Sequence, residues 1–290
     1  MNHKLSPAAY KSLVAMAIRE DVGRGDITAK TTVGSKVHGR AVILSKGHGV
    51  LAGMPVALEV FRQVDRRIKP VKPWKDGRKL EPGDRIMEVH GPAGSILAAE
   101  RASLNFLQRL SGIATATNIL AARIKGTRAK VFDTRKTIPG YRGLDKYAVR
   151  VGGGVNHRDG LYDQILLKEN HFVAAAADGL SFAAVIRQAK KRAGRWYLIE
   201  VETETLEQFR LALAEQADII MLDEFSLANM RKAVAEAKSR RPRPILEASG
   251  GITEKNILSV ARTGVDRISI GALTHSVQAF DMAMYMESAQ

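Results

Sequence analysis

From residue 129 onward the sequence alternates between short apolar runs and helical stretches, and this alternation restricts the fold more than any other feature. The apolar runs cover residues 129–132, 164–167, 196–201, 218–222, 244–246 and 267–270. Helical periodicity fills the intervals at 182–192, 206–215, 227–239 and 253–262. Because the runs lack strict polar alternation, they predict buried strands of a parallel sheet. Six or seven such units predict a TIM-like α/β barrel, incomplete or open, rather than a doubly wound sheet.

The first part of the chain has a different pattern, in which several short strand-like runs accompany two longer helical stretches. The strand-like runs cover 37–45, 50–52 and 85–89, and the helical stretches cover 55–63 and 96–124. We therefore predict an N-terminal α+β sandwich domain over 1–111 and a catalytic α/β barrel domain over 112–275. For residues 276–290 we predict a C-terminal helix that packs back on the N-terminal domain.

Composition excludes several classes of protein. None of the 290 residues is cysteine, which excludes a disulfide scaffold, a thiolate zinc site, an iron–sulfur cluster and a catalytic cysteine, and which fits a reducing compartment. The chain has no apolar run near the roughly 20 residues that a bilayer needs, and its first residues lack the apolar core of a signal peptide. We expect a cytoplasmic protein without a membrane partner.

The formal net charge of +15 leaves several interpretations open. A strongly basic chain can bind nucleic acid or anionic lipid, can hold an anionic small molecule, or can simply have a basic, solvated surface. The sequence contains no nucleic-acid motif and no basic–aromatic interleaving, so we expect no nucleic-acid partner. It also has no Gly-x-Gly-x-x-Gly or Walker A pattern, which argues against dinucleotide and P-loop domains.

The first two predicted strands end in cations. Arg135 and Lys136 follow the first strand, Lys168 follows the second, and Arg158 follows His157 after three consecutive glycines. The segment 123–168 contains 11 Lys or Arg residues against 4 Asp or Glu residues. Isolated surface charges are worth little. Their succession at strand ends, where barrel enzymes do their chemistry, predicts a site for a ligand with several negative groups.

The middle strands end in acids, and the last two end in glycine. Glu202 and Asp223 can hold Mg²⁺ through water and substrate oxygens, stabilise a cationic sugar centre, or form a structural ion-pair network. Glu200 and Glu204 share the strand face of Glu202, so the choice among these glutamates stays open. The residues at the last two strand ends are Ser249, Gly250, Gly251 and Gly271. Glycine-rich strand ends allow a phosphate to bind backbone N–H groups, or they are ordinary helix-entry turns.

Four segments together closely resemble one enzyme family, quinolinate phosphoribosyltransferase, the decarboxylating nicotinate-nucleotide pyrophosphorylase. They are DTRKTIPG at 133–140, KYAVR at 146–150, GGGVNHR at 152–158 and LKENH at 167–171. The likeness extends to 20–28, 99–105, 110–115 and 268–276. The resemblance implies transfer of a phosphoribosyl group from phosphoribosyl pyrophosphate (PRPP) to quinolinate with Mg²⁺. The products are nicotinate mononucleotide, pyrophosphate and CO₂, on the way to NAD.

The resemblance also implies residue roles. Contacts to quinolinate and pyrophosphate are implied for Thr134, Arg135, Lys136, His157, Arg158 and Lys168. Glu202 and Asp223 are implied near the ribose and Mg²⁺ and form the catalytic set with Lys136; the spacing to Asp223 favours Glu202 over Glu200. Contacts to the 5-phosphate are implied for Ser249, Gly250, Gly251 and Gly271. A homodimer is implied, in which Arg101 reaches into the neighbouring active site, and a higher oligomer stays open.

Three alternatives remain at this point. A paralogous group associated with molybdenum transport shares the fold and the Thr-Arg-Lys-Thr segment, but the intact segments around His157 and Lys168 favour quinolinate. A Schiff-base aldolase that uses Lys168 would also fit a barrel. An RNA-binding protein would fit the net charge alone.

Overall fold

The computed structural model describes residues 5–194 and 196–287, which form two compact units. The first unit contains the chain up to Asn118, the segment Thr137–Gly153 and the chain from Ala272 onward; the second contains Ile119–Lys136 and Gly154–Gly271. Our predicted boundary after residue 111 lies inside a single helix, α4 (Ala93–Arg123). The segment Thr137–Gly153, which we placed in the barrel domain, belongs to the first unit. None of the described helices is both long and apolar enough to cross a membrane.

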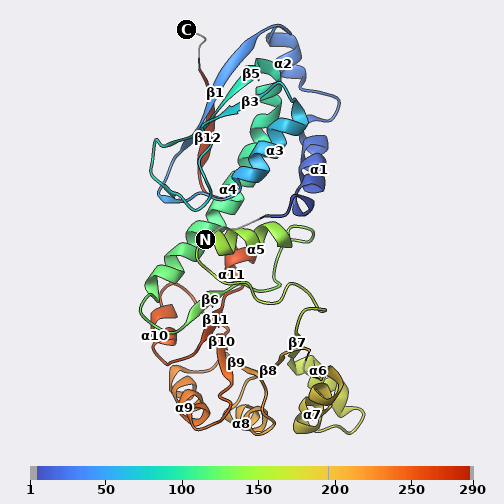
Figure 1. The fold of residues 1–290 in the computed structure, drawn as a ribbon, viewed down its shortest axis with the longest axis vertical. Coiled ribbons are helices and arrows are strands. Elements are labelled where there is room, and N and C mark those ends of the chain that lie inside the picture. Colours follow the sequence, from blue (N-terminus) through green and yellow to red (C-terminus); the bar gives the residue numbers. More distant parts are fainter. Residues whose placement is uncertain (1–4, 195, 288–290) are drawn as a thin grey trace. The chain divides into compact units, whose positions relative to one another are not determined.

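The first unit is built on an antiparallel four-stranded sheet in the order β12-β1-β5-β3 (Figure 1). Its strands are β1 (His38–Ser45), β3 (Lys69–Val71), β5 (Arg85–Pro92) and β12 (Met282–Glu287), and β2 (Gly49–Val50) pairs separately with β4 (Lys79–Leu80). Besides α4, its helices are η1 (Pro7–Ala9), α1 (Lys11–Val22), α2 (Ile27–Thr32), α3 (Met54–Val64), α5 (Arg142–Val151) and α11 (Ala272–His275). Phe61, Leu104 and Leu107 are fully buried in its core.

The C-terminal segment contains a strand and not the helix that we predicted for residues 276–290. Strand β12 pairs with β1 from Met282 opposite Ser45 to Glu287 opposite Arg40. Met282 and Met284 are buried whereas Tyr285 is 47% exposed, which is the period-two pattern of a strand with one covered face. Pairing with the available edge of β1 therefore decides the conformation of this segment. The last three residues of the predicted helix lie outside the described residues.

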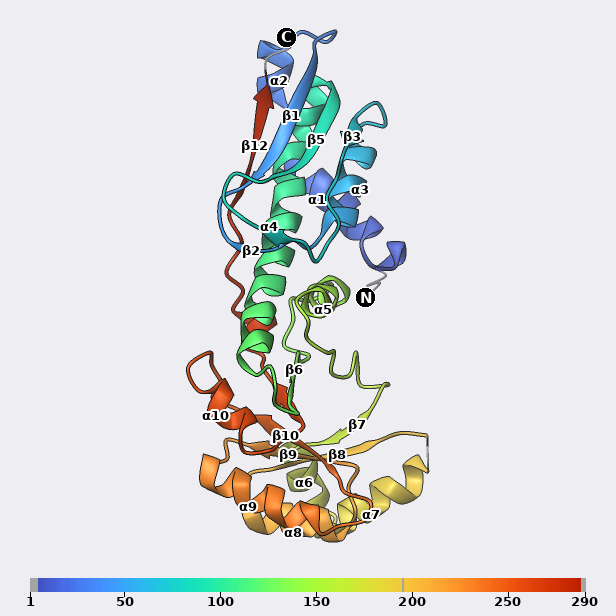
Figure 2. The same ribbon diagram turned by 60° about the vertical axis from the view of Figure 1, so that its left-hand side comes forward.

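The second unit is a sheet of six parallel strands in the order β6-β11-β10-β9-β8-β7 (Figure 2). They are β6 (Lys130–Phe132), β7 (Ile165–Leu167), β8 (Ile199–Thr203), β9 (Ile219–Asp223), β10 (Ile245–Ser249) and β11 (Arg267–Ser269). The strands follow one another in chain order, except that β6 and β7 lie at opposite edges of the sheet. This arrangement confirms the predicted α/β class with an incomplete barrel, and the gap in the sheet lies between the first two strands.

Helices cover the outer face of this sheet, and their starting residues explain where they form. They are α6 (Glu169–Ala176), α7 (Phe182–Ala193), α8 (Leu206–Ala214), α9 (Leu227–Lys238) and α10 (Ile257–Ala261). The hydroxyls of Ser181, Thr205 and Ser226 accept hydrogen bonds from backbone N–H groups in the first turns of α7, α8 and α9. Helix α10 is shorter than the predicted stretch 253–262, because residues 254–256 before it form a turn.

The three consecutive glycines at 152–154 meet different structural needs. A Cβ atom at Gly152 would lie 2.4 Å from the carbonyl oxygen of Ala114 on α4, so this position is closed to any side chain. Gly153 has a φ of +93°, a conformation that L side chains rarely adopt. Close packing and backbone conformation, rather than general flexibility, therefore explain the first two glycines.

We predict that Gly152→Ala lowers the free energy of unfolding by about 1–3 kcal/mol, because the new methyl group would overlap backbone that cannot move aside cheaply. Gly94→Ala is the matched control. Its Cβ would meet nothing closer than 3.8 Å, and alanine in a helix should leave stability unchanged or raise it by up to about 1 kcal/mol. Urea unfolding of both variants measures this, and equal stabilities would contradict the packing argument.

Candidate functional site

A buried carboxylate directly after β6 holds the loop at residues 154–158. Asp133 is fully buried. Its Oδ1 accepts a hydrogen bond from the backbone N–H of His157 at 2.8 Å, and its Oδ2 accepts one from the Asn156 side-chain amide at 2.5 Å. The backbone N–H of Val155 also donates to the carbonyl oxygen of Val131 on β6 at 2.8 Å. The loop that carries His157 and Arg158 is therefore attached to the sheet at several points.

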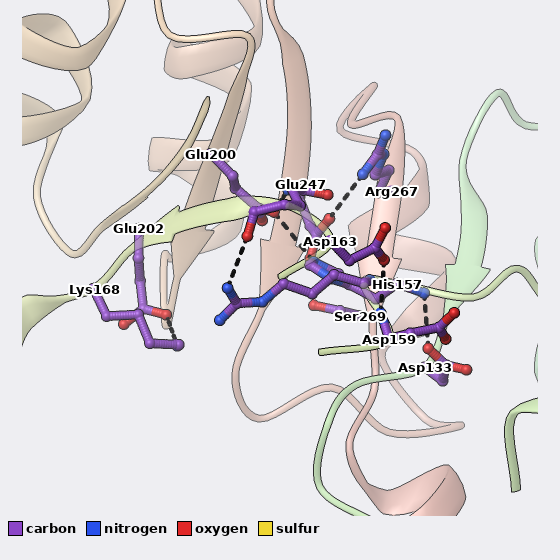
Figure 3. Close-up of polar contacts among 12 residues, drawn as sticks. Asp133, His157, Asp159, Asp163, Lys168, Glu200, Glu202, Glu247, Arg267 and Ser269 are labelled. Carbon is purple, nitrogen blue, oxygen red and sulfur yellow. Dashed lines mark hydrogen bonds and ion pairs between the residues drawn. The ribbon is translucent and has the colours of Figure 1, made fainter. Parts of the chain in front are cut away.

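The imidazole of His157 lies inside the barrel between two buried glutamates (Figure 3). Its Nε2 is 3.2 Å from Glu200 Oε2 on β8 and 3.3 Å from Glu247 Oε1 on β10. Its Nδ1 accepts a hydrogen bond from the backbone N–H of Arg158 at 2.8 Å. Atoms of the protein thus lie close to both ring nitrogens.

Two influences oppose each other at this imidazole. Burial lowers the pKa of His157, but hydrogen bonds and charge from Glu200 and Glu247 outweigh burial and raise that pKa to about 10. The Arg158 N–H directed at Nδ1 instead favours the neutral ring. In both forms Nε2 carries a proton, which lies between the two carboxylates. Burial and the neighbouring Glu247 in turn raise the pKa of Glu200.

Two guanidinium groups next to this network form no ion pair with a carboxylate among the described residues, although the charges of Glu200 and Asp163 act on one of them, Arg158. Arg158 is 7% exposed, and its Nη1 donates to the carbonyl oxygen of Gln164 at 3.0 Å. Burial and the nearby charge of Arg135 lower the pKa of Arg158. The Nε of Arg135 is buried and has no hydrogen-bond partner. The two cations repel each other, and Nε of Arg135 has no acceptor. An anion bound here would neutralise their charge and accept hydrogen bonds from them.

The predicted acidic pair lies on one face of the sheet. Glu202 stands opposite Met221 in the parallel register of β8 and β9, so Asp223, two residues further along β9, points to the same side. Glu202 is 13% exposed at its side chain and pairs with the ammonium of Lys168. Glu200, by contrast, is fully buried against His157. Of the two glutamates, only Glu202 has a carboxylate that a bound ligand can reach.

Two groups of residues could in principle hold a metal ion. His157, Glu200 and Glu247 each offer a ligand atom, and these atoms all lie within 4.8 Å of one another. Mg²⁺ prefers oxygen ligands and keeps several waters, which does not fit a fully buried group with an imidazole nitrogen. Glu202 and Asp223 offer only oxygen and are partly exposed, so this pair fits Mg²⁺ better.

The glycine turn after β10 lies against a glutamate. Ser249 stands opposite Asp223 in the sheet register. Gly250 and Gly251 both have positive φ, at +85° and +57°, so the turn requires glycine at both positions. A Cβ at Gly250 would lie 2.5 Å from Cδ of Glu224, whose side chain therefore covers the turn. No helix begins directly after this turn, since α10 starts at Ile257, so the alternative of an ordinary helix-entry turn does not apply here.

The other predicted site residues are more scattered. Thr134 accepts a hydrogen bond at its hydroxyl from the backbone N–H of Lys136 at 3.0 Å, and Lys136 is exposed. Gly271 follows β11 directly and precedes α11. Arg101 lies exposed on α4 in the first unit. The structure thus brings together the cations near His157, the acidic pair and the Ser249–Gly251 turn within the second unit.

The sequence analysis did not include four supporting residues among the candidate site residues: the buried Asp133 and Glu247, the half-buried Gln164 and the exposed Glu224. A signal for Glu247 was present, since it is a charged residue inside an apolar strand. The strand prediction ended at Leu246, but β10 continues to Ser249 and turns Glu247 inward. Nothing local in the sequence indicates the hydrogen bond that the Gln164 side chain donates to Glu200.

Family models match both parts of the chain. Residues 26–111 match the quinolinate phosphoribosyl transferase N-terminal domain, and residues 113–285 match the C-terminal domain of the same family.

Individual relatives match over nearly the full length. The chain is 42% identical over 284 residues to a probable nicotinate-nucleotide pyrophosphorylase (carboxylating) of Bacillus subtilis, covering 98% of this chain and 94% of the relative. It is 40% identical to the Mycobacterium leprae nicotinate-nucleotide pyrophosphorylase, covering 95% and 96%. The solved nicotinate-nucleotide pyrophosphorylase of Francisella tularensis superposes with a TM-score of 0.91 at 40% identity, covering 98% of each chain. With both domains matched and these relatives aligned almost end to end, the chain belongs to the quinolinate phosphoribosyltransferase family.

Proposed function

We propose that this protein transfers the phosphoribosyl group of PRPP to quinolinate and decarboxylates the product, giving nicotinate mononucleotide, pyrophosphate and CO₂. The observation that carries the proposal is the pair of guanidinium groups of Arg135 and Arg158, whose charges repel each other and which form no ion pair with a carboxylate among the described residues. Quinolinate brings two carboxylates, and the planar guanidinium group binds a carboxylate through two parallel hydrogen bonds. Binding would therefore relieve the repulsion between the two cations.

The second substrate adds further negative charge, which the remaining cations and the glycine turn can accommodate. We assign the 5-phosphate to the backbone N–H groups of Ser249, Gly250, Gly251 and Gly271. In the structure Glu224 covers Gly250. Its carboxylate has to move away before a phosphate binds, since the two negative groups would repel each other. Lys136 and Lys168 are assigned to pyrophosphate and quinolinate contacts.

The bond-making step places positive charge on the sugar. As the bond between ribose C1 and the pyrophosphate oxygen breaks, C1 becomes cationic, and the pyridine nitrogen of quinolinate forms the new bond to C1. Carboxylates fixed near C1 stabilise this charge, and we assign that role to Glu202 and Asp223, which share one face of the sheet. Lys136 neutralises the leaving pyrophosphate.

Decarboxylation then follows from the charge that the first step creates. The alkylated pyridinium nitrogen is positive, so it stabilises the electron pair left on the adjacent ring carbon when CO₂ departs. That carbon afterwards takes a proton. No covalent bond to the protein is needed. Lys168 is paired with Glu202, and an ion-paired ammonium serves binding rather than the Schiff-base chemistry of an aldolase, which requires a neutral amine.

Magnesium is assigned to Glu202 and Asp223, directly or through water. Their oxygen ligands and partial exposure suit an ion that keeps part of its water shell. When bound, the ion supplies charge neutralisation for the phosphate oxygens of PRPP.

We also propose a homodimer in which Arg101 of one subunit contributes to the active site of the other, a role that fits its exposure on α4. Higher assembly is compatible with the same contact. A cytoplasmic location is proposed as well, and the absence of cysteine fits it.

The function is tested by incubating the purified protein with quinolinate, PRPP and Mg²⁺. We expect equimolar nicotinate mononucleotide, pyrophosphate and CO₂, and loss of the reaction when EDTA removes Mg²⁺. Nicotinate in place of quinolinate is the control. It has only one carboxylate, so a transfer to nicotinate would give nicotinate mononucleotide without release of CO₂. Folded protein that forms no product from quinolinate would refute the proposal.

Replacing Arg158 tests its assignment to quinolinate. We expect Arg158→Ala to raise KM for quinolinate at least about tenfold, the loss expected for one hydrogen bond to a charged group, and to leave KM for PRPP within about twofold. Arg187→Ala is the matched control, because Arg187 is an exposed residue of α7 paired with Glu215. An unchanged KM for quinolinate in the Arg158 variant would remove this residue from the site.

A further inference from the structure

Two buried carboxylates inside the barrel meet at one imidazole, although they come from separate strands. Glu200 lies on β8 and Glu247 on β10, with β9 between them in the sheet. Both side chains are fully buried. Their oxygens lie 3.2 and 3.3 Å from Nε2 of His157, which enters the barrel from the loop at residues 154–158. Figure 3 shows the two glutamates converging on the ring.

These positions are an unfavourable place for charge. The interior of an α/β barrel is usually filled by branched apolar side chains. A buried ion pair is often no more stable than apolar residues of the same volume, because both groups lose their hydration. Arg267 lies 3.8 Å from Glu247 and compensates only part of that loss. Stability alone therefore gives a weak reason for placing two glutamates here.

The contacts of these glutamates lead to the proposed quinolinate site. Glu200 accepts a hydrogen bond from the Gln164 side-chain amide. The backbone carbonyl oxygen of Gln164 accepts one from the Arg158 guanidinium. The backbone N–H of Arg158 in turn donates to Nδ1 of His157. Contacts thus join four residues in a closed ring: His157, Arg158, Gln164 and Glu200. Glu247 lies next to the same imidazole nitrogen as Glu200.

We infer that Glu200 and Glu247 are positioning residues for quinolinate, which hold His157 and, through Gln164, the Arg158 guanidinium in the orientation that binds the dicarboxylate. The inference rests on the proposed function. It goes further by assigning a role in substrate recognition to two residues that are too deeply buried to touch the substrate.

The strand positions separate this role from a merely structural one. Glu200 precedes Glu202 by two residues on β8, and Glu247 precedes Ser249 by two residues on β10. Both later residues are assigned to the PRPP half of the site. A variant that disturbs the strands would weaken the binding of both substrates. Loss of the contacts that join His157, Arg158, Gln164 and Glu200 would weaken quinolinate binding alone.

The experiment compares Glu200→Gln and Glu247→Gln with wild type in steady-state kinetics, with each substrate varied in turn, and in thermal unfolding. Glutamine keeps the shape of the side chain and removes its charge. Gln164→Ala is a third variant, which leaves both buried carboxylates and the backbone carbonyl oxygen of Gln164 in place and removes only the hydrogen bond from the Gln164 side chain to Glu200. Glu236→Gln is the matched control, because Glu236 pairs with Arg210 at the surface of α9.

We expect each of the two glutamine variants to raise KM for quinolinate about tenfold, with kcat and KM for PRPP within about twofold of wild type, and Gln164→Ala to raise it severalfold. If the glutamine variants do not fold, Gln164→Ala alone decides. Unchanged KM for quinolinate in the folded variants, or equal rises of both KM values, would overturn the inference. Wild-type protein without turnover of quinolinate would instead overturn the proposed function, so the two failures are distinguishable.

Discussion

Carboxylates buried inside the six-stranded sheet are the constraint on which the candidate site depends. Asp133 fastens the loop that carries His157 and Arg158 to β6. Glu200 and Glu247 receive the imidazole of that loop within the barrel. Because a buried charge is costly unless it is paired, these contacts favour one arrangement of the loop. Its guanidinium group is thereby presented in one orientation before any ligand arrives.

This arrangement also changes the interpretation of the +15 net charge. The segment 123–168, which carries nearly half of the positive excess, does not lie wholly at the strand ends. Its middle part, with α5, belongs to the first unit, and Arg123 and Arg128 form ion pairs with Glu254 and Asp266. Arg135 and Arg158, which form no ion pair within the described part of the chain, are the clearest cations for a ligand, so the ion pairing of individual residues is more informative about the site than the net charge.

Periodicity is a local signal, and it predicted much of the fold. The apolar runs predicted all six strands of the barrel. Ser181, Thr205 and Ser226 cap three of its helices, a local signal that the sequence analysis did not use. Long-range pairing decided the rest. The segment 276–290 is too short and mixed to predict alone, and its residues Met282–Glu287 form a strand because β1 offers an edge.

The candidate site was likewise predictable only in part. Residues at strand ends could be recognised by their position in the sequence, and the resemblance supplied roles for them. The role of Glu247 could not be recognised in this way, because that role depends on contact with His157. The two residues are distant in sequence and meet only in the barrel interior. A crystal structure with quinolinate bound tests the central claim most directly. The account predicts a carboxylate of quinolinate within hydrogen-bond distance of the Arg158 guanidinium, with the contacts of His157 to Glu200 and Glu247 intact; quinolinate bound without contact to Arg158 would contradict it.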